Sequence, residues 1–153
     1  YFEVLHAFFF AYKELESAVA RYGATRQLLG KRSKLHNLQT DLNNLALTYP
    51  INGKSTTCNT ALEINSLSQA YGVMYVMEGA TLGGRVIVPQ LSKHGWVTSC
   101  DCLNFFNSYG EQKQTMWQSF MDVLNNHAEK DNASDICLGS RQAFFYLHSK
   151  LFA

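Results

Sequence analysis

Residues Tyr75–Gly84 read YVMEGATLGG, which places three glycines inside an apolar stretch with helical spacing. A glycine within a helix costs about 1 kcal/mol relative to alanine, so Gly79, Gly83 and Gly84 together would cost roughly 3 kcal/mol. We therefore expect an interaction that offsets this loss. In a continuous helix, Gly72, Gly79 and Gly83 share one face, where backbone rather than side chains forms the surface.

Two kinds of occupant fit such a bare helical face. Another helix can lie there, because small residues let two helices approach closely. A broad planar ligand can also rest on the exposed backbone, with a local bend at the paired glycines 83 and 84. The residue types alone leave both alternatives open.

The rest of the chain predicts an all-α protein that forms one domain over residues 1–153. Only two prolines, Pro50 and Pro89, occur, and no alternating apolar run is bounded by turn residues, so the punctuation of a β protein is missing. Apolar spacing predicts about six or seven helices in a compact bundle, with helices over residues 1–22, 34–47, 60–94, 98–110, 112–128 and 136–151.

Three of the expected helix boundaries depend on particular residues. Gly23 should end the first helix. Thr60 and Glu63 have the spacing of a capping box and should begin the long third helix. Thr98 or Ser99 should begin a short helix that carries the apolar residues 103–106 and ends at residue 110.

Composition excludes several classes of protein. The 153 residues are 46% hydrophobic and 16% charged, which is enough apolar material for a core and argues against disorder. A net charge of +1 provides no excess positive field for nucleic acid. No run reaches the roughly 20 apolar residues of a membrane span, so we expect no membrane partner and a cytoplasmic location. The four cysteines, Cys58, Cys100, Cys102 and Cys137, are expected to be reduced and mostly buried, since their spacing fits neither a disulfide framework nor a zinc site.

The glycine block resembles the distal-helix signature of haem oxygenases, and most closely that of the bacterial biliverdin-producing branch associated with bacteriophytochromes. The flanking residues that share this resemblance are Tyr71, Gly72, Arg85, Val86 and Ile87. The later sequence FFNSYG at residues 105–110 is similar to a second stretch of that family, and so are the residues that follow it, Thr115, Met116, Trp117 and Phe120. The resemblance covers almost the whole chain.

The resemblance implies a haem-oxygenase-like fold and an activity. Haem would be both cofactor and substrate, and O2 would cleave it to biliverdin, carbon monoxide and ferrous iron. Electrons would come from a separate donor such as ferredoxin or a flavin reductase, and a bacteriophytochrome is an expected recipient of the biliverdin.

The resemblance also assigns roles to residues around the glycines. Gly79 and Gly83 would lie over the iron and shape the oxygen pocket, while Gly84 would permit a bend. Ala80 stands where animal-type members carry an aspartate, which leaves Thr81, a water or backbone carbonyls for proton relay.

Further residues would contact the haem at the edges of the pocket, and Tyr75 and Phe144 are among them. Glu78, the nearest carboxylate to the glycines, is also expected to contact the haem and could transfer protons directly; its alternative role is a partly buried acid paired with a base. Gln118 stands where the family commonly has an arginine for the haem propionates. Other cations could replace that arginine, and the candidates are Arg85, Lys113 and Arg141.

The iron ligand is the main departure from the family. Its proximal histidine belongs to a helix that precedes the segment matching Tyr1–Arg21, so we expect that helix upstream of this chain. His6 is a weak fallback, because a histidine among apolar helical residues is usually a packing residue. Two other functions stay open: a non-catalytic haem- or bilin-binding protein of the same fold, and an interaction protein whose glycine groove takes a partner's helix.

Overall fold

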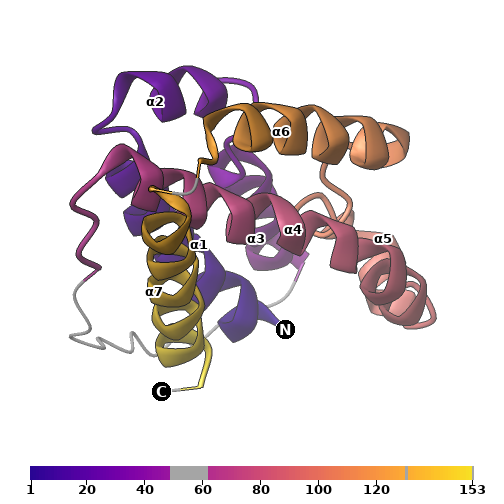
Figure 1. Ribbon diagram of the computed structural model, residues 1–153. Helices are drawn as coiled ribbons and strands as arrows, with labels where there is room; N and C mark the ends of the chain where they lie inside the picture. The colour runs from indigo at the N-terminus through magenta and orange to yellow at the C-terminus, as the bar shows by residue number, and fades with distance from the viewer. Residues whose placement is uncertain (49–61, 130, 153) are drawn as a thin grey trace.

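The computed structural model describes residues 1–48, 62–129 and 131–152, and in this part of the chain helices are joined by turns and loops and no strand occurs (Figure 1). The all-α prediction is therefore confirmed. Its elements are seven α-helices and one 3-10 helix: α1 (Phe2–Val19), α2 (Gly23–Leu29), α3 (Leu35–Thr48), α4 (Leu67–Leu91), α5 (Gly95–Cys100), η1 (Gly110–Gln112), α6 (Lys113–His127) and α7 (Ala133–Leu151).

Helix α4 is the central element, and α6 lies beside it in the antiparallel direction (Figure 1). Late residues of α6 contact early residues of α4, since the His127 Nε2 lies 3.0 Å from the Ser68 hydroxyl. Early residues of α6 contact late residues of α4, since the Arg85 guanidinium donates to the Gln114 amide oxygen at 3.4 Å. This pairing places one long side of α4 against α6.

Helix α7 crosses α4 at a contact made by two glycines. A Cβ atom at Gly72 would lie 2.0 Å from the Ile136 carbonyl oxygen, and one at Gly139 would lie 2.0 Å from the Gln69 carbonyl oxygen. The Ser140 hydroxyl donates to the Gly72 carbonyl oxygen at 3.0 Å. Of the two occupants expected for the glycine-bearing face of α4, a packed helix is therefore the one present at Gly72.

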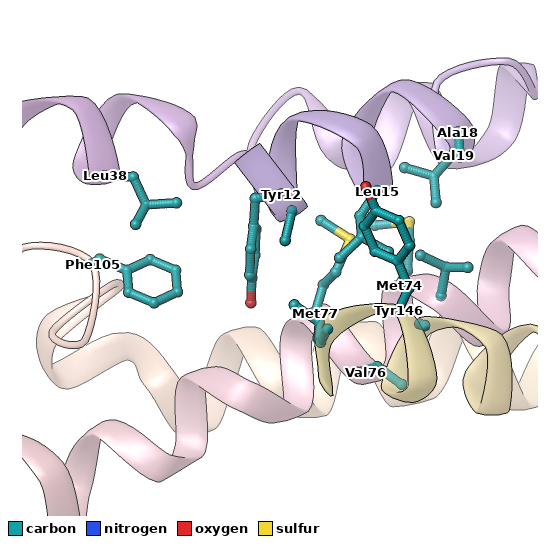
Figure 2. Close-up of a cluster of buried hydrophobic side chains, with 14 of the residues drawn as sticks. Tyr12, Leu15, Ala18, Val19, Leu38, Met74, Val76, Met77, Phe105 and Tyr146 are labelled. Carbon is teal, nitrogen blue, oxygen red and sulfur yellow. The ribbon is translucent and has the colours of Figure 1, made fainter. Parts of the chain in front are cut away.

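The core fills the space between α1, α4 and α7 (Figure 2). The side chains of Leu15 and Val19 from α1 point toward Met74 and Met77 of α4, and Tyr146 of α7 closes the layer (Figure 2). All five are buried, so the apolar stripe predicted for the first helix is the stripe that packs.

Three predicted boundaries are wrong. Gly23 begins α2 after a break at residues 20–22, whereas it was expected only to end the preceding helix. Helix α4 begins at Leu67, and Ser66 caps it by accepting from the Gln69 N–H at 3.1 Å; Glu63 is not helical, and Thr60 lies outside the described residues.

The expected helix over residues 98–110 is also wrong. Thr98 and Ser99 lie inside α5, which ends at Cys100, and residues 103–109 form turns. The Asp41 carboxylate, which is fully buried, accepts from the backbone N–H groups of Asn104 and Phe105 at 2.9 and 2.8 Å. These bonds hold the segment in a turn conformation that its apolar spacing does not reveal.

The prediction of four reduced cysteines is wrong for one pair. A disulfide joins Cys100 and Cys102. Cys137 is free but exposed rather than buried, and Cys58 lies outside the described residues. None of the helices in the described ranges has both the length and the apolar content needed to cross a bilayer.

Candidate functional site

The surface of α4 beyond its crossing with α7 is the candidate site. We call it the glycine face and define it by Tyr75, Gly79, Gly83, Val86 and Ile87, which helical spacing places on one side of α4. The three side chains of this face are open to solvent, with exposed fractions of 38% for Tyr75, 70% for Val86 and 37% for Ile87. A Cβ at Gly83 would meet only the Ile87 Cδ1 atom, at 3.9 Å. The backbone at Gly83 is therefore accessible from outside the protein.

Gly79 is more covered than Gly83. A Cβ there would lie 3.7 Å from Cζ3 and 3.8 Å from Cη2 of Trp117, which is ordinary van der Waals contact. The Trp117 ring also packs against Tyr75, with ring centroids 5.5 Å apart. The glycine face is thus bordered by α6 along one side, and Trp117 forms that border.

The structure places Gly84 away from the glycine face. A Cβ at Gly84 would lie 1.9 Å from the Phe106 carbonyl oxygen and 3.1 Å from the Lys113 Nζ. Gly84 therefore allows the turn segment at residues 103–109 to pack closely on α4. Lys113 is buried in the same place, where its ammonium donates to the Asn107 side-chain oxygen at 3.2 Å.

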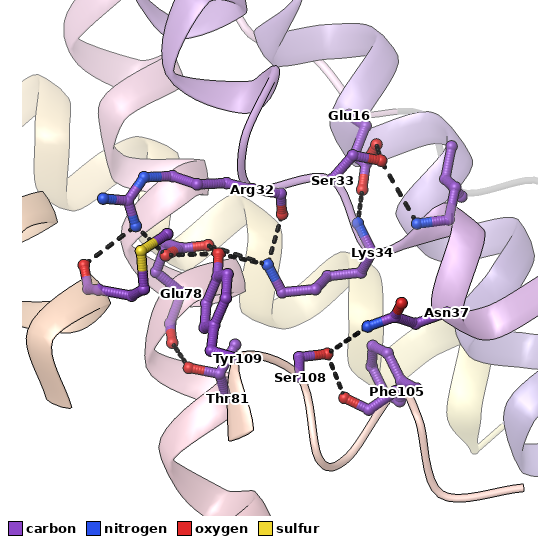
Figure 3. A network of polar contacts seen from close by, with 12 residues as sticks. Glu16, Arg32, Ser33, Lys34, Asn37, Glu78, Thr81, Phe105, Ser108 and Tyr109 are labelled. Carbon is purple, nitrogen blue, oxygen red and sulfur yellow. Dashed lines mark hydrogen bonds and ion pairs between the residues drawn. The ribbon is translucent and has the colours of Figure 1, made fainter. Parts of the chain in front are cut away.

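Glu78 and Thr81 also lie away from the glycine face, on the buried side of α4 (Figure 3). The Thr81 hydroxyl donates to the Glu78 carbonyl oxygen at 2.6 Å. The Glu78 carboxylate, only 2% exposed, forms ion pairs with Arg32 and with Lys34, the latter at 3.2 Å. The Tyr109 hydroxyl lies 2.8 and 3.0 Å from the two oxygens of this carboxylate. The interpretation of Glu78 as a buried acid paired with a base is confirmed.

The segment between α2 and α3 supplies both bases of this network. Lys34 is almost completely buried, and its ammonium also donates to the Tyr109 hydroxyl at 2.6 Å and to the Arg32 carbonyl oxygen (Figure 3). Arg32 further donates to the Met116 carbonyl oxygen at 3.0 Å. The network therefore ties α4 to α6 and to the α2–α3 connection, and its Glu78 carboxylate is buried rather than part of the open glycine face.

Burial shifts the pKa of several groups in and beside this network. Desolvation lowers the pKa of Lys34 from its ordinary value, and the nearby Glu78 carboxylate partly opposes this shift. Desolvation raises the pKa of the Tyr12 and Tyr109 hydroxyls well above the ordinary value of 10.0, and the negative charge of Glu78 raises both further.

These tyrosines predict a loss of stability above pH 10. A tyrosine whose pKa is raised by folding contributes stability that is complete below pH 10 and is lost as the pH rises toward the folded-state value. Lys34 has the opposite effect at lower pH. Because folding lowers its pKa, the stability of the protein increases as the pH rises toward 10.5, the ordinary pKa of lysine. We expect the urea concentration at which half of the protein is unfolded to decrease as the pH is raised from about 10 to about 12. The Tyr12→Phe variant should show a smaller fall; an equal fall would contradict this origin.

The remaining predicted contact residues lie at different places on the surface. Ala80 is exposed next to the glycine face. The Gln118 amide donates to Asp122 at 3.1 Å and lies in an open polar depression on α6. Phe144 of α7 is 60% exposed and stands one turn after Ser140, the residue that bonds to Gly72. Arg141 is also exposed on α7, so the predicted cations do not gather at one point.

The rings of His6, His94, His127 and His148 contact other side chains. His6 stacks on Phe2 with ring centroids 5.8 Å apart and contacts Phe10 at 4.7 Å, as expected of a packing residue. No group of three or more metal-ligating side chains occurs in the described ranges. The described residues thus show no preformed multi-ligand metal site.

Sequence reasoning missed two features of this region. It gave no role to Trp117 as the border of the glycine face, although its position in a second stretch similar to the family was noted. It also missed Arg32 and Lys34 as the partners of Glu78. Basic side chains separated by a single residue are usually exposed to solvent, and the sequence around Arg32 and Lys34 does not indicate that both are buried.

The glycine face has limited chemistry of its own. Backbone and apolar groups form it, and the Tyr75 hydroxyl is its only polar side-chain group. Such a surface suits a flat apolar ligand that itself supplies any reactive group. Comparisons with protein-family models, with curated proteins and with solved structures found no match to this chain.

Proposed function

We propose that the glycine face is the distal wall of a haem site and that the protein is a haem oxygenase with a haem-oxygenase-like fold. The proposed reaction cleaves haem to biliverdin, carbon monoxide and ferrous iron, with O2 as oxidant and electrons from an external donor such as ferredoxin or a flavin reductase. The observation that supports it best is the contrast among the glycines of α4. Gly72 and Gly84 make room for the protein's own backbone, whereas Gly83 faces open space and Gly79 touches only one aromatic ring.

The residues present fit one side of a planar porphyrin. Backbone at Gly83 allows a ring system to approach α4 more closely than any other residue would permit, and over Gly79 the ring would take the space that the Trp117 indole now fills. Tyr75, Ile87 and Trp117 would contact the edges of the ring, and the small Ala80 leaves the neighbouring surface open. Bound haem would supply the iron that activates dioxygen and the porphyrin that is oxidised. The chain's own contribution is to orient the ring and to exclude water from one face.

A second candidate function is non-catalytic binding of haem or a bilin. The observation that favours it is that the imidazoles of His6, His127 and His148 already pack against or bond to other side chains. His6 packs between two phenylalanines, His127 contacts Ser68 and Tyr71, and His148 contacts Phe152. The catalytic proposal instead takes its iron ligand from the family resemblance, which places the proximal histidine before Tyr1.

Titration with hemin tests both candidates. We expect a Soret band that sharpens at one equivalent of hemin and shifts with azide, or with carbon monoxide after reduction of the iron with dithionite, because these ligands bind iron on an accessible distal side. An enzyme should then produce biliverdin absorbance when oxygen and a ferredoxin or flavin reductase are supplied; a binding protein should not. A free-hemin spectrum at all ratios would contradict both candidates and favour a partner helix as the occupant of the glycine face.

Substitution of Gly83 tests whether the glycine face is the binding surface. Gly83→Leu places a bulky side chain in open space, so we expect hemin binding and turnover to be lost while helix content stays close to that of the parent. Gly95→Leu is the matched control, since it makes the same change at a glycine of α5 whose added Cβ also meets open space and which lies outside the glycine face. Circular dichroism measures helix content. Unfolding of Gly83→Leu would show that this glycine serves helix packing.

A further inference from the structure

Trp117 divides the glycine face into a covered and an uncovered part. At Gly79 the nearest atoms to an added Cβ are two carbons of the Trp117 ring, at 3.7 and 3.8 Å. At Gly83 the nearest atom belongs to Ile87, a residue of the same helix. The indole therefore occupies the space directly above Gly79, whereas among the described residues no atom of another helix lies within 4 Å of a Cβ at Gly83.

A planar ligand that covers both glycines needs the space that Trp117 fills. Non-bonded carbon atoms pack at about 3.5–4.0 Å, so a ring lying against Gly79 cannot coexist with the indole in its present place. A smaller ligand that lies only over Gly83 and Ile87 has no such conflict. In its present position Trp117 thus blocks broad ring systems and leaves room for narrow ones.

The contacts of Trp117 permit such a movement. The ring is half-buried and packs against Tyr75 and against Phe120, whose ring centroid is 6.2 Å away. In the described part of the chain no hydrogen bond fixes its indole N–H. Packing against these rings and against the edge of the hydrophobic core holds the indole, and rotation of a partly exposed side chain is fast compared with binding.

We propose that Trp117 is the specificity-determining side chain of the glycine face: its indole occupies part of the ligand site and rotates away when a planar ring system covers Gly79. This inference rests on the proposed function, because it assumes a flat ligand on the same surface. It predicts that the free protein binds a broad planar ligand more weakly than it would with the indole already displaced, because only the molecules with the indole displaced can bind.

The test compares hemin affinity across Trp117 variants of the full chain. Trp117→Ala removes the obstacle, and we expect it to bind hemin about tenfold more tightly if the displaced state is about 10% populated in the parent. Trp117→Phe keeps a smaller ring in the same place and should change the affinity less. Trp96→Phe is the control, because Trp96 lies next to Tyr1 and His94 and outside the glycine face.

A second measurement follows the indole itself in a protein that keeps Trp117. In the Trp96→Phe background, 5-fluorotryptophan labels only residue 117, and zinc protoporphyrin serves as a diamagnetic flat probe. We expect its fluorine resonance to move to a new position at saturation. An unmoved resonance at saturation overturns the inference, and so does a Trp117→Ala affinity that equals or falls below that of the parent.

The outcomes separate this inference from the proposed function. Hemin binding by the parent with no gain in Trp117→Ala overturns the role of Trp117 and leaves the haem site in place. Binding by Trp117→Ala but not by the parent supports both. Absence of binding in both proteins overturns both. If Trp117→Ala fails to fold by circular dichroism, the fluorine measurement decides.

Discussion

Gly72→Ala is expected to lower the free energy of unfolding by roughly 2 to 4 kcal/mol, although alanine is the better helix former by about 1 kcal/mol. The added Cβ would lie 2.0 Å from the Ile136 carbonyl oxygen and 2.7 Å from the Ser140 backbone nitrogen. Backbone atoms of α7 cannot rotate away as a flexible side chain could, so the helices must separate. Urea denaturation monitored by circular dichroism measures the loss.

Gly83→Ala is the matched control for this prediction, since both residues belong to the same face of the same helix. Its Cβ would meet only Ile87 Cδ1 at 3.9 Å, so the helix-propensity gain of about 1 kcal/mol should appear as added stability. The two variants should therefore change stability in opposite directions. Equal effects would contradict the division of α4 into a packed part and an open part.

This contrast also shows what the sequence could not predict about the glycines. Spacing alone places Gly72, Gly79 and Gly83 on one face. The path of α7 decides which of them is covered, and that path depends on a second glycine far along the chain, Gly139, which lets the helices touch. The sequence interpretation therefore identified the surface but not its boundaries.

Helices with long apolar stripes were predicted well, and α1, α3, α6 and α7 lie close to their expected ranges. The start of α4 was predicted wrongly because two segments have capping-box spacing. Ser66 and Gln69 cap the observed start: Ser66 accepts from the Gln69 N–H, and the Gln69 side chain accepts at 3.0 Å from the N–H of Asn65, the residue before the cap. The Ser66 hydroxyl also donates to Asp135 at 2.9 Å, so a tertiary contact selects this start. Such a contact leaves no local mark in the sequence.

The turn at residues 103–109 was wrongly predicted to be helical for a related reason. Its apolar residues have helical spacing, but a buried aspartate from α3 binds its backbone, and Tyr109 adopts a left-handed conformation with φ of 68°. That conformation is uncommon for a non-glycine residue. The bonds between the Tyr109 hydroxyl and Glu78 hold the residue in place, so the turn depends on a partner that is distant in sequence.

Glu78→Gln is expected to have the largest effect on stability, a loss of about 3–5 kcal/mol, because removing one partner of a buried ion pair leaves the other charges uncompensated. Arg32 and Lys34 would both stay buried, and an amide cannot balance two cations. The left-handed Tyr109 would also lose a charged acceptor. Urea denaturation at pH 7 measures the loss, and the exposed Asp122→Asn variant controls for removal of a carboxylate elsewhere.

A triple variant separates the cost of stranded charge from simple loss of packing. Arg32→Met, Lys34→Met and Glu78→Met together replace the ionic network by apolar side chains, and buried ion networks replaced in this way often retain stability. We therefore expect the triple variant to be more stable than Glu78→Gln alone. A triple variant that is less stable than Glu78→Gln would show that the hydrogen bonds to Tyr109 and to the Met116 carbonyl matter more than charge balance.

The Glu78→Gln variant also discriminates between the two roles considered for Glu78, which are a contact with haem and a buried ion pair. Its carboxylate is buried and ion-paired with Arg32 and Lys34, so the structure predicts that Glu78→Gln acts on folding rather than on haem contact. A contact with haem predicts the reverse: a free energy of unfolding within about 1 kcal/mol of the parent, together with a weaker hemin affinity. Measuring both quantities on one preparation separates these outcomes, because a buried charge network and a ligand contact change different equilibria.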